Sequence, residues 1–442
     1  MTYSEFKDVL LKTALEKGCD AAEVYAVDTD RFFVEVMEGD VDSYSVSKSI
    51  SLALRVTVNG RDGYAYTMLL DEAESFIMRA MENAGACQTG ECKPMQQMCE
   101  YKAVELPEAP LLNMTAAERI AFAKELEKQV LAADKRCIRV AENQVEVIQT
   151  TTHIANTLGL DASRQAVYAQ CSTEPVLQNG TQLQKGRAAR SGKAVFEIEA
   201  CAKAAVADAA RKFDARIIPS GEYPVVLEKG AAAEVLNGFF TVFSAERAQK
   251  GLSLLRGKEG EQVAASCVSI TDDPLLAFNP RAFDDEGVPS VRTTVIENGT
   301  LKSMLYDLDS ARKAGCCSTS NGGRDSAMSP VEIMPSNFYI LPGAATYDQL
   351  LENLGDGVII RDLSGLHVGM DPVSGGFSLL AGGWLRKNGQ LYPVEQITVA
   401  GNFFTMLQEI EEVGNDLHLG APRKAVVGSP SLRLKRLRIA GK

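Results

Sequence analysis

Residues 51–67 have the sequence SLALRVTVNGRDGYAYT, which carries a strong signal for an antiparallel pair of strands. Asn59-Gly60 separates two runs rich in β-branched and aromatic residues. A type I′ turn requires positive φ at both central residues, and Asn and Gly tolerate that conformation best. The stretch therefore predicts a β-hairpin with strands at Ser51–Val58 and Gly63–Thr67.

The segments on both sides of this hairpin predict a unit of helix, antiparallel strands and helix. Apolar side chains have helical spacing from Phe6 to Ala14, with Ser4 as the expected cap. A capping-box pattern at Asp71 and Glu74 marks the start of the closing helix. The strands expected between the first helix and the hairpin are 23–27, 32–37 and 43–47.

The same order of elements recurs after a connector rich in Pro, Met and Gln at 87–112. Thr115 and Glu118 form another capping box, and an Ala-rich helix at about 200–211 closes the second unit. Strands are expected between them at 138–140, 142–151 and 166–172. The first half thus reads as a duplicated unit, with similar parts at about 1–86 and 113–215.

The chain changes character after Pro219-Ser220-Gly221. One helix at about 231–250 is followed mostly by strands, including hairpins at Asn298-Gly299 and Asn388-Gly389. The final strand, Leu432–Ile439, carries four basic residues, which suits a solvated edge strand. We expect an α+β fold with a domain at 1–215 and a β-rich domain at 216–442.

Composition and charge restrict the classes of function. The 442 residues carry 46 basic and 58 acidic side chains, a formal net charge of −12, and 45% of them are hydrophobic. An acidic chain is a poor match for sequence-independent nucleic-acid binding, so nucleic acid is an unlikely partner. No stretch resembles a membrane span or a signal peptide, and we expect a cytoplasmic protein.

The ten cysteines are expected to be free thiols in that compartment. Cys87, Cys92 and Cys99 cluster, but their spacing is not that of a C-x-x-C metal or redox site. A surface loop of reduced thiols is the preferred interpretation, and a metal role is the open alternative.

No complete catalytic set is found in the sequence. The chain lacks a G-x-S-x-G elbow and phosphate-binding glycine motifs, and His153, His367 and His418 have no nucleophile or carboxylate at a diagnostic spacing. The acidic stretches 272–273 and 284–286 lack the alternating ligands of a calcium loop, so turns are preferred there. We therefore assign no catalytic and no metal-binding residue, and a non-catalytic subunit is favoured over an enzyme.

Two glycine-rich stretches are candidate substrate-binding segments. Successive backbone N–H groups in Asn321-Gly322-Gly323-Arg324 would suit a carboxylate or phosphate, although a turn is the simpler interpretation. Gly375 and Gly376 would allow a peptide backbone to approach closely and add to an exposed sheet edge. Bulges within a packed sheet explain these two glycines equally well.

Several stretches together resemble one known family, the TldD/PmbA proteins, and in particular the TldE (PmbA) branch. The resemblance extends in order over nearly the whole chain. It is carried by 22–25, 283–289 with 297–299, 306–324, 382–402 and 413–416. It implies a TldD/PmbA-type fold and a zinc metallopeptidase assembly in which a TldD-type and a TldE-type subunit enclose the active site. The substrates implied are unstructured or modified peptides, and an older name is modulator of DNA gyrase.

The chain departs from the family pattern at the expected zinc ligands. TldD-branch members carry an H-E-x-x-x-H helix and a later Cys, whereas the resemblance places Asn237, Gly238 and Val242 at the motif positions here. The region of the late Cys is Gly420-Ala421-Pro422-Arg423-Lys424. Neutral Asn and aliphatic side chains cannot replace an imidazole pair and a thiolate on zinc. We therefore expect no cofactor on this chain and zinc on a TldD-type partner.

Three interpretations remain open at this point. The first is a TldE-like subunit of a peptide-hydrolysing pair, with a homodimer when the chain is isolated. The second is a binding or regulatory protein that acts without hydrolysis on a toxin, an antitoxin or gyrase. The third is a hydrolase whose metal site is built from acidic loops such as 284–286.

Overall fold

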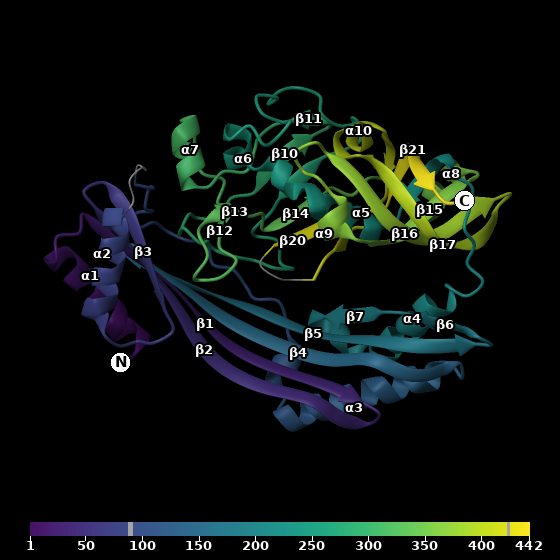
Figure 1. Cartoon of the computed structure of the whole chain (residues 1–442), viewed down its shortest axis with the longest axis horizontal. Helices are drawn as coiled ribbons and strands as arrows, with labels where there is room; N and C mark the ends of the chain where they lie inside the picture. Colours follow the sequence, from purple (N-terminus) through teal and green to yellow (C-terminus); the bar gives the residue numbers. More distant parts are fainter. Residues whose placement is uncertain (87–91, 422–424) are drawn as a thin grey trace.

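The computed structural model describes residues 1–86, 92–421 and 425–442. A long, curved antiparallel sheet formed by the N-terminal half lies beneath a strand-rich C-terminal domain (Figure 1). Helices and sheets are both abundant, and the predicted α+β class is confirmed. Cys87 lies outside the described residues, while the described cysteines are free thiols.

The N-terminal sheet has the strand order β3-β2-β1-β4-β5-β6, with β7 paired to β5. The hairpin predicted at Asn59-Gly60 is confirmed, because Val58 pairs with Arg61 across it. The strands are β1 Ala21–Met37, β2 Asp40–Val58, β3 Arg61–Thr67, β4 Cys137–Asn156, β5 Asp161–Asn179, β6 Gln182–Lys185 and β7 Ala188–Ser191.

The short strands expected at 23–27 and 32–37 are wrong as separate elements, because β1 runs through both without a break. The same holds for the segments at 43–47 and 51–58, which form β2, and for the pieces at 138–140 and 142–151, which lie within β4. The middle of β1, at Asp28–Arg31, is polar because it lies between two hydrophobic cores, one under each pair of helices, and belongs to neither. Because the apolar pattern is interrupted at such places, the sequence predicted separate short strands where the structure has continuous ones.

Four helices cover one face of this sheet in two pairs. The first pair, α1 Tyr3–Glu16 and α2 Ala73–Ala86, packs on Val24, Ala26, Leu52 and Leu54. The second pair, α3 Ala116–Ala133 and α4 Ile198–Ala210, packs on Phe32, Val34 and Val145. Short 3-10 turns at Pro110–Asn113 (η1) and Gly192–Phe196 (η2) flank the second pair. The predicted duplication of helix, strands and helix is confirmed.

The helix caps agree in part with the predictions. Thr115 and Glu118 form the predicted capping box of α3. The cap of α1 is Thr2, paired with Glu5, so the assignment of Ser4 was wrong by two residues. The capping box at Asp71 and Glu74 was also wrong, because α2 begins at Ala73.

The C-terminal domain is built around a closed ring of strands. In the order β17-β16-β15-β8-β21-β18, strand β17 also pairs with β21, so five strands close on themselves. The strands of this sheet are β8 Gly221–Leu227, β15 Gly357–Ser364, β16 Gly376–Lys387, β17 Gln390–Asn402, β18 Ile410–Val413 and β21 Leu432–Ala440. The hairpin at Asn388-Gly389 joins β16 to β17 as predicted.

A second sheet, of order β11-β10-β9-β14-β20-β19, stands beside the ring, and β12 pairs with β13 separately. The hairpin predicted at Asn298-Gly299 joins β10 to β11. These strands are β9 Ile270–Asp272, β10 Thr293–Glu297, β11 Thr300–Leu301, β12 Gly322–Gly323, β13 Glu332–Ile333, β14 Asn337–Ile340, β19 His418–Leu419 and β20 Val426–Ser429.

The final strand is not a solvated edge, so that interpretation was wrong. Strand β21 lies between β8 and β18 and closes the ring on β17. Its three arginines instead pair with carboxylates of neighbouring strands and turns. Arg433 pairs with Glu411 and Glu412, and Arg436 pairs with Glu222 and Glu409.

The helix expected at 231–250 is wrong as one element. It is divided into α5 Lys229–Phe239, the 3-10 turn η3 Phe240–Phe243 and α6 Ala245–Gln249. The break arises because the backbone at 243–245 bonds with Leu305 on both sides, and the Ser244 side chain then caps α6. The remaining helices are α7 Leu308–Ala314, α8 Tyr347–Leu354, α9 Leu366–Gly369 and α10 Phe403–Gln408.

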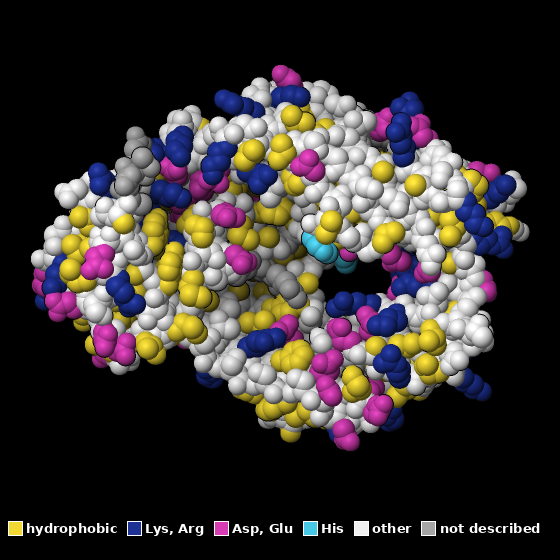
Figure 2. All heavy atoms as spheres, viewed as in Figure 1, with side chains coloured by type: hydrophobic (Ala, Val, Ile, Leu, Met, Phe, Trp, Pro, Cys, Tyr) yellow, Lys and Arg dark blue, Asp and Glu magenta, His cyan; other side chains and the backbone are white. Residues whose placement is uncertain are grey.

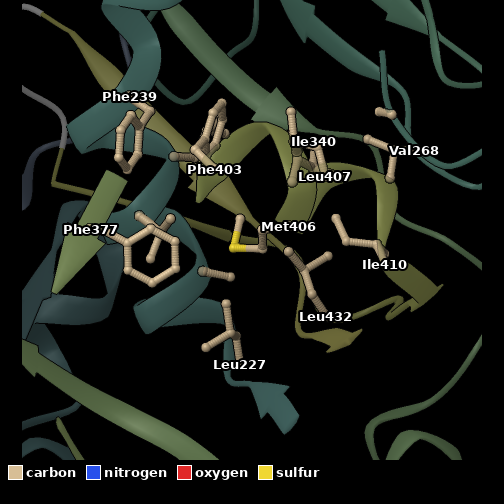
Figure 3. Close-up of a cluster of buried hydrophobic side chains, with 14 of the residues drawn as sticks. Leu227, Phe239, Val268, Ile340, Phe377, Phe403, Met406, Leu407, Ile410 and Leu432 are labelled. Atoms are coloured by element: carbon tan, nitrogen blue, oxygen red, sulfur yellow. The ribbon is translucent and has the colours of Figure 1, made fainter. Parts of the chain in front are cut away.

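The core of this domain joins the ring to α5 and α10. Phe239 of α5 stacks on Phe403 of α10, with ring centroids 4.6 Å apart, and meets Phe377 of β16 edge-on. Leu227, Met406 and Leu432 fill the neighbouring space (Figure 3). This packing fixes which side of α5 remains outside the core. Among the described residues, no helix is long and apolar enough to cross a membrane.

Candidate functional site

The predicted anion-binding loop at 321–324 lies buried where the two domains meet. Its backbone N–H groups do bind carboxylates, but these belong to the chain itself. Gly322 N donates to Asp284 Oδ2 at 2.9 Å, and Arg324 N donates to Asp285 Oδ2 at 2.8 Å. Asn321 is fully buried, and its side chain donates to Asp272 Oδ2 at 2.7 Å. Substrate binding by Asn321 and Gly322 stays a prediction, while Gly323 and Arg324 line the cavity described next.

A cavity of about 600 Å³ lies between the uncovered face of the N-terminal sheet and the C-terminal domain. Figure 2 shows the molecule hollowed between these two parts, with charged side chains around the hollow. Strands β1, β4 and β5 supply one wall, and 279–285 with 323–334 supply the other. We call this space the interdomain cavity.

Asp285 makes a charge contact across this junction. Its Oδ1 accepts from Arg164 Nη2 of β5, and both side chains are largely buried, at 8% and 17% exposed. Burial alone would raise the pKa of Asp285, but the charges of Arg164 and Arg281 and the hydrogen bonds from Tyr25 and Arg324 N together outweigh that effect, and the pKa is lowered. The carboxylate therefore stays ionised inside the protein.

The carboxylates beside Asp285 bind backbone N–H groups rather than converge on a cation. Asp284 accepts from Glu286 N and Val288 N, each at 2.9 Å, besides Gly322 N. Burial raises the pKa of Asp284 to about 6. Because their oxygens are already bound, the hypothesis of a metal site in acidic loops such as 284–286 is not supported. Within residues 1–86, 92–421 and 425–442, no group of three or more His, Cys, Asp or Glu is placed to hold a metal ion.

A second cavity, of about 320 Å³, lies against α5. The helix places Gly230, Ala233, Glu234 and Asn237 on this side, at the i, i+3, i+4, i+7 spacing of one helix face. Strands β19 and β20 and the chain between them contribute His418, Gly420, Ala421, Ala425 and Val427. We call this space the α5 cavity.

Glu234 and His418 are the titratable side chains of the α5 cavity. Burial, reinforced by the charge of Asp362, raises the pKa of Glu234 to about 7. Burial, with Lys229 nearby, lowers the pKa of His418. Both shifts disfavour charge, so the cavity presents two groups that are readily neutral near pH 7.

Three models of one protein family match the chain. Residues 22–84 match domain 1 of the PmbA/TldA metallopeptidases, 109–213 match the central domain, and 220–441 match the C-terminal domain. The chain belongs to the PmbA/TldD family.

Relatives and solved structures of this family cover most of the chain. Metalloprotease PmbA of Escherichia coli O157:H7 is 24% identical over 446 residues, which are 98% of this chain and 95% of that protein. A TldD homologue of Buchnera aphidicola, also called a metalloprotease, is 31% identical over 270 residues, 56% of this chain and 54% of the relative.

Two crystal structures share the fold with a TM-score of 0.89, and each match covers 99% of this chain and 100% of the other. One is a Thermotoga maritima protein called a modulator of DNA gyrase, 30% identical. The other is TldE from Thermococcus kodakarensis, 23% identical, which shows the fold alone.

The family description, metallopeptidase, implies a bound metal ion. Whether this chain could bind that ion depends on which metal-binding side chains it offers. Of the three motif positions assigned from the sequence, only Asn237 faces the α5 cavity. Gly238 packs against Met370, and Val242 is fully buried in η3, beyond the end of α5. The α5 cavity thus offers one carboxylate and one imidazole, fewer than the three protein ligands of a catalytic zinc site. The described residues do not fit a catalytic zinc ion.

Gly375 and Gly376 lie in the turn that leads into β16. Gly376 pairs with Asn402 of β17, while the next residue, Phe377, also bridges to Met370 on the other side. Gly375 has φ of +79° and packs against Phe404, so a side chain there would be strained. The expectation of an exposed sheet edge at these glycines is therefore wrong, and peptide binding by them stays a prediction.

Sequence reasoning missed Glu234, Arg164 and Arg281. The helical spacing that places Glu234 on one face with Gly230 and Asn237 is visible in the sequence. That this face lines a cavity is not. Arg164 and Arg281 are isolated arginines in sequence, and only the packing of the two domains places both on the interdomain cavity.

Replacement of Glu234 by Gln is expected to change how stability depends on pH. The raised pKa means that folded Glu234 holds its proton at pH values above the ordinary glutamate pKa of 4.5, so its contribution to stability is lost as pH rises to about 7. Glu234→Gln should therefore gain stability relative to the parent between these pH values. The carboxylate of Glu234 lines the α5 cavity, but much of the side chain is open to water, so screening should keep the gain below about 1 kcal/mol. Urea unfolding at pH 4.5 and 7.5 measures it.

The exposed residue Glu352 of α8 supplies the matched control. Glu352→Gln should leave the difference between the two pH values as in the parent chain. A parallel response of Glu234→Gln and Glu352→Gln would contradict the raised pKa.

Proposed function

We propose that this chain is a TldE-like subunit of a two-component zinc metallopeptidase that hydrolyses unstructured or modified peptides. The zinc belongs to a TldD-type partner, and this chain supplies cavity walls and assembly surface. Membership of the PmbA/TldD family supports the peptidase context, and the TldD homologue among the relatives supports the kind of partner.

The observation that carries the proposal is the donor set of the α5 cavity. Glu234, Asn237 and His418 give it a polar lining, but two zinc-binding side chains leave the ion without a third protein ligand. A subunit of this kind needs a second chain for metal-dependent hydrolysis. In that role the chain still supplies cavity walls and assembly surface, because it has the complete fold of the family.

A second candidate is a binding protein that acts on DNA gyrase or a toxin–antitoxin pair without hydrolysis. It is favoured by the Thermotoga maritima structure, 30% identical and called a modulator of DNA gyrase. The net charge of −12 weakens direct contact with DNA but leaves contact with a protein open.

Reconstitution with a TldD-type partner tests the proposal. We expect the isolated chain, purified and dialysed against zinc, to hold well under one zinc per chain by elemental analysis. It should cleave no unstructured peptide, while the mixture with its partner should. Each protein alone and the mixture with chelator are the controls. Stoichiometric zinc on this chain, or cleavage by it alone, would refute the assignment, and a bound but inactive pair would favour the second candidate.

A further inference from the structure

The interdomain cavity has far more cationic than anionic side chains on its wall. Five arginines face it, against two carboxylates: Arg31, Arg164, Arg187, Arg281 and Arg324, and Glu146 and Asp285. Both carboxylates are already bound, Glu146 by Arg31 at 2.7 Å and Asp285 by Arg164. The wall has no further carboxylate, and of the other arginines Arg187 and Arg324 pair with Glu142 and Glu23 outside the lining.

Two guanidinium groups in this wall retain hydrogen-bonding capacity. Arg281 Nη2 donates to Ser320 O at 2.7 Å, but its Nε is buried and has no hydrogen-bond partner among the described residues. The Nε of Arg164 is in the same state, although its Nη2 binds Asp285. Burial lowers the pKa of Arg281, and the positive charge of Arg164 lowers it further, while Asp272, Asp284 and Asp285, whose carboxylates already accept hydrogen bonds from other groups, act in the opposite direction. Two cations that destabilise each other inside a cavity favour the arrival of an anion.

The sheet wall of the cavity, which also carries Arg31 and Arg164, is suited to a peptide rather than to a bare ion. Val27, Phe33 and Ile148 form an apolar floor on the sheet, and Thr150, Thr152 and Gln165 add polar groups beside it. A space of about 600 Å³ holds a few residues of extended chain. A cavity of that volume cannot enclose a nucleic-acid duplex, whose major groove alone is about 12 Å wide.

We propose that the interdomain cavity binds a carboxylate-bearing peptide segment, with Arg164 and Arg281 as the groups that recognise the carboxylate. Planar guanidinium groups match carboxylates in bidentate geometry, and such contacts are stronger in a buried site. The carboxylate is that of an acidic side chain or of a peptide C-terminus. The choice of a peptide rests on the proposed function, whereas the carboxylate preference rests on the cavity alone.

Binding to the isolated, full-length chain tests the proposal. The probe is a hexapeptide of five alanines and one glutamate, labelled at the N-terminus and followed by fluorescence anisotropy. Three further versions carry a C-terminal amide, Gln in place of Glu, or both changes. We expect the doubly neutral peptide to bind at least about tenfold more weakly than the parent peptide, the ratio that one lost charged hydrogen bond would give. The singly changed peptides tell which carboxylate is recognised.

Variants of the protein locate the binding site. Arg281→Gln should weaken binding of the parent peptide about tenfold without affecting the doubly neutral one. Because Arg281 is buried, Arg187→Gln is the second variant. The Arg187 side chain is 63% exposed at the rim of the cavity and should weaken binding a few-fold. Arg139→Gln, on β4 but outside the cavity, is the matched control and should bind like the parent. Thermal unfolding verifies that each variant is folded.

Three results would overturn the proposal: no binding by the parent chain at millimolar peptide, equal binding of charged and doubly neutral peptides, or an equal loss in Arg139→Gln. None of these involves the partner or hydrolysis. A reconstituted pair that cleaves peptides would leave the proposed function standing while the carboxylate site is rejected. Selective binding without cleavage by the pair would do the reverse.

Discussion

Replacement of Gly63 by Val is expected to destabilise the N-terminal domain by about 3 kcal/mol or more. Gly63 lies in β3, directly against α2. A Cβ atom there would lie 2.1 Å from Ala80 O and 2.4 Å from Ala84 N, both in the helix backbone. Backbone atoms cannot rotate away as a side-chain end can, so the helix must move off the sheet. Urea unfolding at pH 7 measures the loss.

Gly186 gives the same test in the second repeat. A Cβ atom there would lie 2.1 Å from Ala205 O and 2.4 Å from Ala209 N of α4. The two glycines thus have equivalent partners, an Ala pair four residues apart on the closing helix of each unit. Gly186→Val should therefore be destabilising to a similar degree. The duplication, inferred from the order of elements, extends to individual residues at this contact.

Gly85 supplies the matched control on α2 itself. A Cβ atom at Gly85 meets nothing within 4 Å. Gly85→Ala should stabilise by up to about 1 kcal/mol because alanine is the better helix former. If Gly63→Val lowers the free energy of unfolding and Gly85→Ala raises it, the loss in Gly63→Val comes from the close approach of β3 to α2 and not from the loss of a glycine. A Gly63→Val variant as stable as the parent would mean that α2 does not contact β3 as described.

Local signals in the sequence were enough for the hairpins and for the presence of the four helices of the N-terminal domain. Asn-Gly turns at 59–60, 298–299 and 388–389 and the capping box at Thr115 each act within a few residues. The long strands were not predictable as units because the middle of β1 changes its surroundings from one helix pair to the other. The role of β21 in closing the ring depends on a pairing with β17 more than thirty residues away.

The candidate site shows the same limit. The loop at 321–324 was a candidate anion-binding segment, with a turn as the simpler interpretation; in the structure its backbone N–H groups bind Asp284 and Asp285 of the same chain. Nothing near the loop in sequence indicates that these carboxylates fill it. In contrast, the deficit of zinc ligands was visible beforehand, because a residue type that is missing from a helix is missing wherever that helix lies.

Asp285→Ala is expected to cost about 3–5 kcal/mol, because it leaves a buried guanidinium without its counterion. Asp285 binds Arg164 across the domain junction and accepts from Arg324 N at 2.8 Å. Its lowered pKa fixes the sign of the pH dependence: the contribution is present above the ordinary aspartate pKa and is lost as pH falls through the lowered value. The difference between variant and parent should therefore be full at pH 7 and shrink in acid.

Two further variants separate loss of the charge pair from general damage. Glu199→Ala breaks an exposed pair with Lys203 on α4 and should leave the urea midpoint almost unchanged. The double variant Arg164→Met/Asp285→Leu removes both charges and should recover part of the loss, because an apolar pair needs no counterion. If Asp285→Ala alone stays within 1 kcal/mol of the parent, Arg164 must reach water from the interdomain cavity. The junction would then be held by the apolar cluster of Tyr25, Ile154 and Phe283 rather than by charge.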